Sequence, residues 1–166
     1  MSRLRPLAFV AGAAAYAAPV LMLASDVALI TYRSVPGIAL QRIALTLFVP
    51  AIGGVLMLAH DRSRWQRGAG AALAALGAAA IALAPATLVM PTRPPAVLFP
   101  LGLLILSSAM IGSSVSRRVA ALVAAGALLF PLAHISGVAA ALVSGDVILL
   151  VAFWSLAPRV MSRSNR

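Results

Sequence analysis

The sequence predicts an all-α fold, a polytopic transmembrane helix bundle of about six spans. Of its 166 residues, 63% are hydrophobic and 10% are charged, and the mean hydropathy is +1.06. In soluble domains about a quarter of the residues are charged. Apolar runs of about 17 to 25 residues, the length that spans a bilayer, follow one another with short breaks. Strands are not expected, because Ala, Leu and Gly dominate and period-two alternation is missing.

We interpret the whole chain as a single integral membrane domain. The predicted spans are residues 7–30, 38–59, 69–90, 96–115, 119–135 and 138–157.

The first span resembles a secretory signal peptide at its start. Arg3 and Arg5 precede an apolar run that contains the small-residue stretch Ala15-Tyr16-Ala17. The run continues to Ile30, which is longer than a signal core. We therefore expect an uncleaved first helix, with a cleaved signal peptide as the alternative.

Prolines lie inside four of the predicted spans, and the third span is rich in small residues. Proline inside a helix removes a backbone hydrogen bond and favours a kink. Such prolines are Pro19, Pro50, Pro85 and Pro131. The third span is nearly all Ala, Gly and Leu, so small residues occur on every face, and we expect it to pack closely at the centre of the bundle.

The last two spans allow two interpretations. Residues 119–157 form either two helices that turn near Ser136-Gly137, or one long helix and a half-helix that follows a break at Ser144-Gly145. The arginines that flank this region must lie on one side of the membrane, which requires two crossings. The turn near Ser136-Gly137 is therefore predicted, and it leaves Asp146 near mid-membrane.

The positive charge predicts the topology. All thirteen basic residues are arginines, and ten of them fall on one face of the predicted bundle. The other three are Arg33, Arg42 and Arg93. By the positive-inside rule both termini are cytoplasmic, and the helical type points to the inner membrane of a bacterium. Nucleic acid is not an expected partner, because no basic groove with interleaved aromatic residues is present.

Several classes of chemistry are excluded. The chain has no cysteine, so it has no disulfide, thiolate metal site or cysteine nucleophile. It also lacks a Gly-rich phosphate loop, a Gly-x-Ser-x-Gly elbow and a His-Glu-x-x-His pair. Its two histidines, His60 and His134, fall on opposite faces, which disfavours a haem or zinc site. We predict no cofactor.

Two of the three acidic residues, Asp26 and Asp146, interrupt apolar runs. A charge inside a bilayer costs a few kcal/mol, so such residues usually face the protein interior and often mark a functional site. We expect the depths of the two to differ by about 10 Å at 1.5 Å rise per residue, so that they share a cavity only if tilt or the Pro19 kink closes this gap. Two carboxyls in one cavity could divide into a protonated acid and an ionised base.

Other polar residues have structural and functional interpretations. Asp26 could form a structural ion pair with Arg33 or Arg42. Asp146 has no arginine at similar depth, so it is either protonated or faces water or a polar ligand. His134 could cap the outer turn or relay protons. The hydroxyls could line a polar interior or bond back to a carbonyl of their own helix. These hydroxyls are Ser25, Thr46, Ser107, Ser108 and Ser144.

The two aspartate segments resemble motifs of the YhhN-like lysoplasmalogenase family of multi-helix membrane proteins. That family carries a Ser-x-x-Gly-Asp type motif and a Ser-Asp motif. The matching residues here are Ser25-Asp26, Tyr32-Arg33, Pro36-Gly37 and Ser144-Gly145-Asp146-Val147-Ile148-Leu149. The family usually has about eight helices, with the Gly-Asp motif early, whereas here six are predicted and this motif lies last. The resemblance implies that Asp26 and Asp146 act as acid and base on a vinyl-ether lysophospholipid.

Three functions follow as hypotheses. The first is a lipid-directed hydrolase with its acidic site inside the membrane, which has membrane lipids as partners. The second is a small proton-coupled or ion transporter, in which Asp146 protonates reversibly and a small solute is the substrate. The third is a non-catalytic membrane subunit whose aspartates bind arginines of a partner helix.

Overall fold

The computed structural model describes residues 4–32, 35–58, 64–83, 94–111, 115–136 and 138–162, and within these ranges every regular element is an α-helix. The helices are α1 (Leu4–Tyr32), α2 (Val35–Leu58), α3 (Arg64–Leu83), α4 (Pro94–Met110), α5 (Arg117–Ser136) and α6 (Ala139–Ser162). The predicted all-α fold is confirmed.

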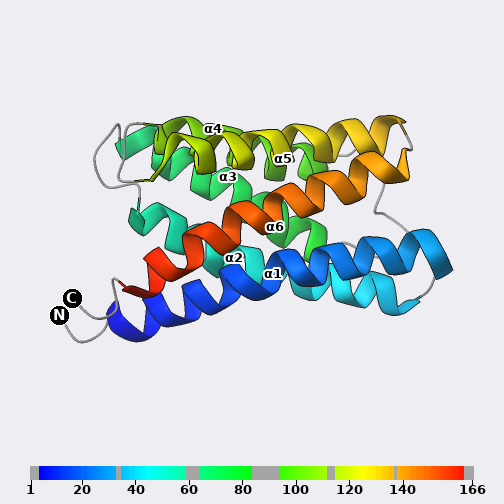
Figure 1. The fold of residues 1–166 in the computed structure, drawn as a ribbon, viewed down its shortest axis with the longest axis horizontal. Helices are drawn as coiled ribbons and strands as arrows, with labels where there is room; N and C mark the ends of the chain where they lie inside the picture. Colours follow the sequence, from blue (N-terminus) through cyan, green and yellow to red (C-terminus); the bar gives the residue numbers. More distant parts are fainter. Residues whose placement is uncertain are drawn as a thin grey trace.

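The helices form a closed ring (Figure 1). Each helix packs against its neighbours in sequence, α1 also packs against α6, and α2 contacts α6 across the ring. Successive helices run in opposite directions, so the two termini lie at the same end of the bundle.

The protein is an integral membrane protein. Helices α1, α2, α3 and α6 are long and apolar enough to cross a bilayer, and Val97–Met110 in α4 is a shorter apolar helix. Large apolar side chains lie on the outer surface, where Phe9 is 61% exposed and Leu76 is 63% exposed. Continuous apolar surface of this kind is suited to contact with lipid.

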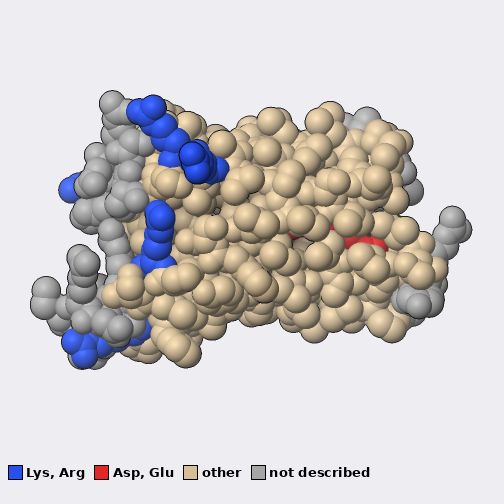
Figure 2. All heavy atoms as spheres, in the orientation of Figure 1, with Lys and Arg blue, Asp and Glu red and all other residues tan. Residues whose placement is uncertain are grey.

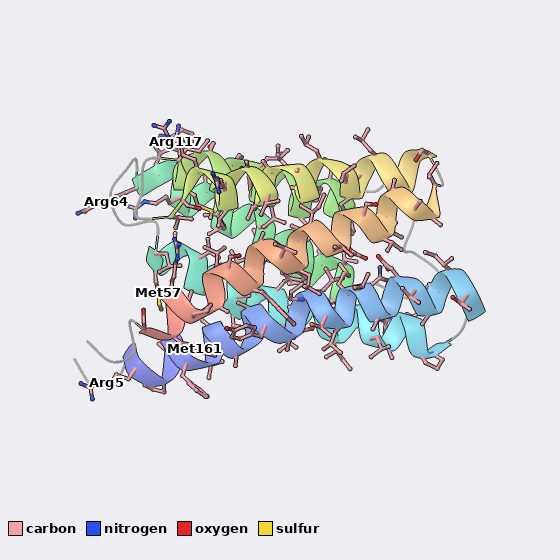
Figure 3. All side chains as sticks on the ribbon, viewed as in Figure 1. Arg5, Met57, Arg64, Arg117 and Met161 are labelled. Atoms are coloured by element: carbon pink, nitrogen blue, oxygen red, sulfur yellow. The ribbon has the colours of Figure 1, made fainter. Side chains whose placement is uncertain are left out.

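Arginines concentrate at one end of the ring (Figures 2 and 3). Figure 3 places Arg5, Arg64 and Arg117 there, at the end where α1 begins and α6 ends. We call this the arginine-rich end. The opposite end, where α1 ends and α6 begins, is the distal end.

Helix boundaries differ from the predicted spans mainly at α3. This helix begins at Arg64, five residues before the predicted span, and its described part ends at Leu83. Pro85 lies outside the described residues. Helix α6 is continuous from Ala139 to Ser162, so the chain turns after Ser136 and no break occurs at Ser144-Gly145. Prolines 19, 50 and 131 all lie within continuous helices.

Helices α3 and α4 pack backbone against backbone. A Cβ atom added to Gly102 would meet the backbone nitrogen of Ala74, and one added to Gly70 would lie 2.7 Å from the nitrogen of Leu106. The small residues of α3 thus permit close packing, as expected. The predicted position at the centre of the bundle is wrong, because α3 is a ring member whose main contacts are with α2 and α4. Small residues on one face are sufficient for this pairing.

Four phenylalanines fill the interior of the ring. Phe48 of α2 makes edge-to-face contacts with Phe99 of α4 and Phe153 of α6, with ring centroids 5.4 and 5.2 Å apart. Phe99 also meets Phe130 of α5 at 5.9 Å. None of the four is more than 6% exposed. This phenylalanine chain joins four helices and leaves an apolar centre.

Candidate functional site

The register of α1 against α6 is fixed near the middle of the helices. The indole Nε1 of Trp154 donates a 3.1 Å hydrogen bond to the backbone carbonyl oxygen of Tyr16, and the two rings meet edge to face at 5.9 Å. Because the helices are antiparallel, ten residues onward from Tyr16 and eight residues back from Trp154 reach levels within about 3 Å of each other, at 1.5 Å rise per residue. Those positions are Asp26 and Asp146.

The structure brings Asp26 and Asp146 together. Their carboxyl groups are neighbours that interact electrostatically at close range. Asp26 is 2% exposed and Asp146 is 1% exposed. The Asp146 carboxyl lies within hydrogen-bonding reach of the Asp26 carboxyl, and apart from Asp26 its oxygens have no hydrogen-bond partner among the described residues. The two side chains form a buried carboxyl pair.

The expected depth difference of about 10 Å is wrong. Helix α1 continues to Tyr32, six residues beyond Asp26, and α6 begins at Ala139, seven residues before Asp146. At 1.5 Å per residue these distances from the distal end are about 9 and 10 Å. The aspartates therefore lie at one level of the same half of the bundle.

The carboxyl pair lies at a seam between α1 and α6 (Figure 2). In this view acidic atoms are visible as a narrow streak between the two helices, toward the distal end. The rest of the described surface around the streak is uncharged. The pair is thus nearest to the flank of the bundle that faces lipid.

Ser25 positions Asp26. It is fully buried, and its hydroxyl donates a 2.9 Å hydrogen bond to the carbonyl oxygen of Gly37 in the first turns of α2. A Cβ atom on Gly37 would lie 2.8 Å from Cγ of Leu29, so glycine permits the close approach of α1 to α2 here. Ser25 is therefore a cross-link between helices next to the carboxyl pair.

The other candidate hydroxyls bond back to their own helices. Ser144 is exposed and donates to the carbonyl oxygen of Ala140 at 2.7 Å. Thr46, Ser107 and Ser108 likewise donate to carbonyl oxygens three or four residues earlier. This is the second of the two roles predicted for them. Each of these four bonds stays within one helix, so none of them joins hydroxyls into a polar interior.

Gln41 is a polar residue that the sequence pattern did not single out. It is 8% exposed and lies one turn from Gly37 on the buried face of α2, which continues through Leu45 and Phe48. Its position one turn after Gly37 becomes informative only once the hydrogen bond from Ser25 to Gly37 is known. Gln41 therefore lies close in depth to the carboxyl pair.

The remaining predicted site residues are only partly placed. Arg42 is half-buried and follows Gln41 in α2, on the helix that packs against α1. Its ion pair with Asp26 stays a prediction. Arg33 and the side chain of His134 lie outside the described residues.

The carboxyl pair is suited to acid–base chemistry. Within the described part of the chain no group of three or more His, Cys, Asp and Glu side chains gathers. Two neighbouring carboxyls in a dry site favour a state with one shared proton, because like charges repel strongly there. One group can then donate a proton while the other accepts one.

The route from the carboxyl pair to the arginine-rich end is apolar. Phe153 lies seven residues beyond Asp146 in α6, about 10 Å toward that end. It belongs to the phenylalanine chain that fills the ring. Among the described residues, the phenylalanine chain therefore lies between the carboxyl pair and the arginine-rich end.

Comparisons with protein-family models, with curated proteins and with solved structures give no match to this chain.

Proposed function

We propose that this protein is a lipid-directed hydrolase of the bacterial inner membrane, and that its carboxyl pair cleaves the vinyl-ether bond of a single-chain phospholipid. The meeting of Asp26 and Asp146 in the membrane carries the proposal. The resemblance of both segments to the YhhN-like lysoplasmalogenases supports the choice of substrate. The arginine-rich end is cytoplasmic in this proposal, in keeping with the positive-inside rule.

Asp146 acts as the acid. Its side chain is 1% exposed and lies beside that of Asp26, and two neighbouring buried carboxyls favour a state in which they share one proton. The acid protonates the vinyl carbon that is not bonded to oxygen. The electron pair of the double bond forms the new C–H bond, and positive charge develops on the adjacent carbon and the ether oxygen.

Asp26 acts as the base. Its carboxylate takes a proton from water, whose oxygen bonds to the cationic carbon and gives a hemiacetal. The hemiacetal then breaks its bond to the glycerol oxygen, which gains a proton as the hydroxyl loses one. The products are a fatty aldehyde and the glycerophosphodiester, which keeps the headgroup and carries a free glycerol hydroxyl in place of the chain.

Because the two carboxyls are neighbours, the site can return to its starting protonation state. After one turnover Asp146 has lost a proton and Asp26 has gained one. Direct contact, or one water between them, returns the proton without access to bulk solvent. Two isolated carboxyls at different depths would lack this short route.

The interior packing favours a hydrolase over a transporter. A transporter requires a polar route that reaches both faces, whereas the phenylalanine chain occupies the ring between the carboxyl pair and the arginine-rich end. A subunit whose aspartates bind a partner's arginines would need them on an open surface. Both aspartates are at most 2% exposed.

The direct test is an assay of the purified protein on lysophospholipids that differ only in the chain linkage: vinyl ether, alkyl ether or acyl ester. We expect aldehyde release from the vinyl ether alone. Removal of a general acid or base costs about 100- to 10,000-fold in rate, so Asp146→Asn and Asp26→Asn should both lose activity on this scale.

Asp61→Asn is the matched control, because Asp61 is the third acidic residue of the chain and lies outside the two apolar segments. It should retain wild-type activity. Absence of aldehyde release by the wild type from any of the lipids, in the presence of folded protein, would contradict the proposal. Equal loss in all three variants would also count against a specific carboxyl pair.

A further inference from the structure

We infer that the lipid reaches the carboxyl pair sideways, between α1 and α6, from the membrane leaflet at the distal end. The inference rests on the proposed function and adds to it the route and the leaflet of the substrate. Three features of the described residues carry it: the sealed half of the α1–α6 seam, the apolar border of the other half, and the depth of the carboxyls.

The seam is sealed at the arginine-rich end. A Cβ atom on Gly12 would meet Cγ of Met161 and would lie 3.2 Å from the carbonyl oxygen of Ala157. Next along α1, Tyr16 is joined to Trp154 by the hydrogen bond and ring contact. No lipid chain fits between helices whose backbones approach this closely.

Beyond Tyr16 the border of the seam changes. Ile30 lies four residues after Asp26, and Val143 lies three residues before Asp146, so each occupies the helix face of its aspartate one turn nearer the distal end. Ile30 is 45% exposed and Val143 is half-buried. Acidic atoms are visible from outside only in this half of the seam (Figure 2).

The seam thus combines apolar edges with a polar base. An apolar chain can lie against Ile30 and Val143, with the two carboxyls at the base of the seam. Apart from Asp26, the oxygens of Asp146 have no hydrogen-bond partner among the described residues, so the pair can still bind a ligand. The side chains at the seam must part slightly, because the carboxyls are almost fully covered.

The depth of the pair identifies the reactive bond. The carboxyls lie about 9 to 10 Å from the distal ends of α1 and α6. At 1.5 Å per residue, α1 with 29 residues and α6 with 24 are about 43 and 36 Å long, so both extend past a hydrocarbon core of about 30 Å, and the pair lies about 3 to 7 Å inside the distal edge of that core. The pair therefore lies in the distal leaflet, above the bilayer midplane, where a bond close to the headgroup can reach it. The linkage at the glycerol is such a bond, and one near the chain terminus is not.

The first experiment delivers substrate to one leaflet. Wild-type protein is reconstituted in one orientation, which is established by labelling a cysteine introduced at the arginine-rich end, and the vinyl-ether lysophospholipid is added from one side. Aldehyde release is measured before the lipid crosses the bilayer. We expect release at least about tenfold faster from the distal leaflet, on the scale of a 1.4 kcal/mol preference.

The outcomes separate the two proposals. Faster release from the leaflet at the arginine-rich end, or equal release from both, overturns the route while the hydrolase remains. Absence of release from either leaflet and from detergent-solubilised protein overturns the hydrolase itself, and the route with it.

The second experiment closes the seam. The native chain has no cysteine, so the double variant Ile30→Cys/Val143→Cys can be cross-linked selectively with a short bis-maleimide. Cross-linking should lower turnover at least about tenfold relative to the same variant before cross-linking.

The matched control is Tyr16→Cys/Trp154→Cys, which joins the same two helices in the sealed half, where the native rings already touch. Loss of the native hydrogen bond and ring contact should slow the unlinked variant relative to the wild type, and cross-linking, which rejoins the helices at this level, should not lower its turnover by more than about a further twofold. Equal loss in both pairs, or no loss in the first, overturns the inference. Melting temperatures of all four samples confirm that the cross-linked proteins are folded.

Discussion

The indole of Trp154 is hydrogen-bonded to the backbone carbonyl oxygen of Tyr16, across 138 residues of sequence. This contact joins the first and last helices of the ring at one defined register. Asp26 and Asp146 lie on the same two helices, on the distal side of the contact. The register of α1 against α6 therefore determines whether the two carboxyls meet.

Trp154→Phe should weaken this register. The substitution keeps an aromatic ring but removes the N–H donor, and interhelical hydrogen bonds in membrane proteins contribute about 0.6 kcal/mol on average and up to about 1.7. We expect a lower melting temperature in detergent and a decrease in hydrolysis. Trp65→Phe is the control, since Trp65 is 73% exposed and should tolerate the change. An equal effect of the two substitutions would argue against a special role for the Trp154 contact.

Gly102→Ala should destabilise the α3–α4 pair. The added methyl group would collide with the backbone of Ala74, which cannot move as a flexible side chain can. Overpacking of this kind costs about 1 to 3 kcal/mol. Thermal unfolding of the purified protein measures the effect.

Gly53→Ala, unlike Gly102→Ala, should not destabilise the protein. It lies inside α2, and a Cβ atom there has no neighbour within 4 Å. Alanine is favoured over glycine in a helix by about 0.5 to 1 kcal/mol, so the variant should be as stable as the wild type or more stable. Destabilisation by both glycine substitutions to the same extent would mean that close packing is not the cause.

Phe48→Ala should disrupt the interior of the ring. Phe48 touches both Phe99 and Phe153, and its side chain is fully buried. Truncation of a buried phenylalanine costs about 3 to 5 kcal/mol in soluble proteins, and we expect a loss of this order in chemical unfolding. Phe9→Ala, at a position 61% exposed in α1, should change stability little. A small effect at Phe48 would show that the phenylalanine chain contributes little to the bundle.

The predicted ion pair of Asp26 with Arg42 can be measured by a double-mutant cycle. Asp26→Asn, Arg42→Gln and the double variant are compared with the wild type by unfolding free energy. Removal of one partner of a buried pair typically costs about 3 to 5 kcal/mol, so the second substitution should restore part of the loss. Additive losses would exclude the pair. The same cycle with Arg33→Gln tests the alternative partner.

Much of the architecture follows from local properties of the chain. The apolar runs around Ala18 and Leu149 have the length and composition of membrane helices, and the arginines at positions 5, 64 and 117 lie at one end because successive spans reverse direction. The turn after Ser136 follows from the same charge rule. The position of α3 could not be predicted, because small residues on every face suit a ring member as well as a central helix.

The sequence indicated only part of the candidate site. Asp26 and Asp146 stood out because ionisable groups are rare inside membranes, and Ser25 because it precedes one of them. Gln41 did not, since a single amide in an apolar helix has no such signal. The back-bonding of Ser144 depends on which way its hydroxyl turns, and composition carries no information on that choice.

The sequence by itself determined a helical membrane protein, the concentration of arginines at one of its ends and the two acidic residues of interest. It could do so because hydropathy and charge act within single spans. Only the tertiary structure decided that Asp26 and Asp146 form a pair. Their separation of 120 residues in the chain is bridged by the packing of α1 against α6. The register of that packing depends on the fit of Gly12 to Met161 and of Trp154 to Tyr16, a property of two helices together that neither span carries alone.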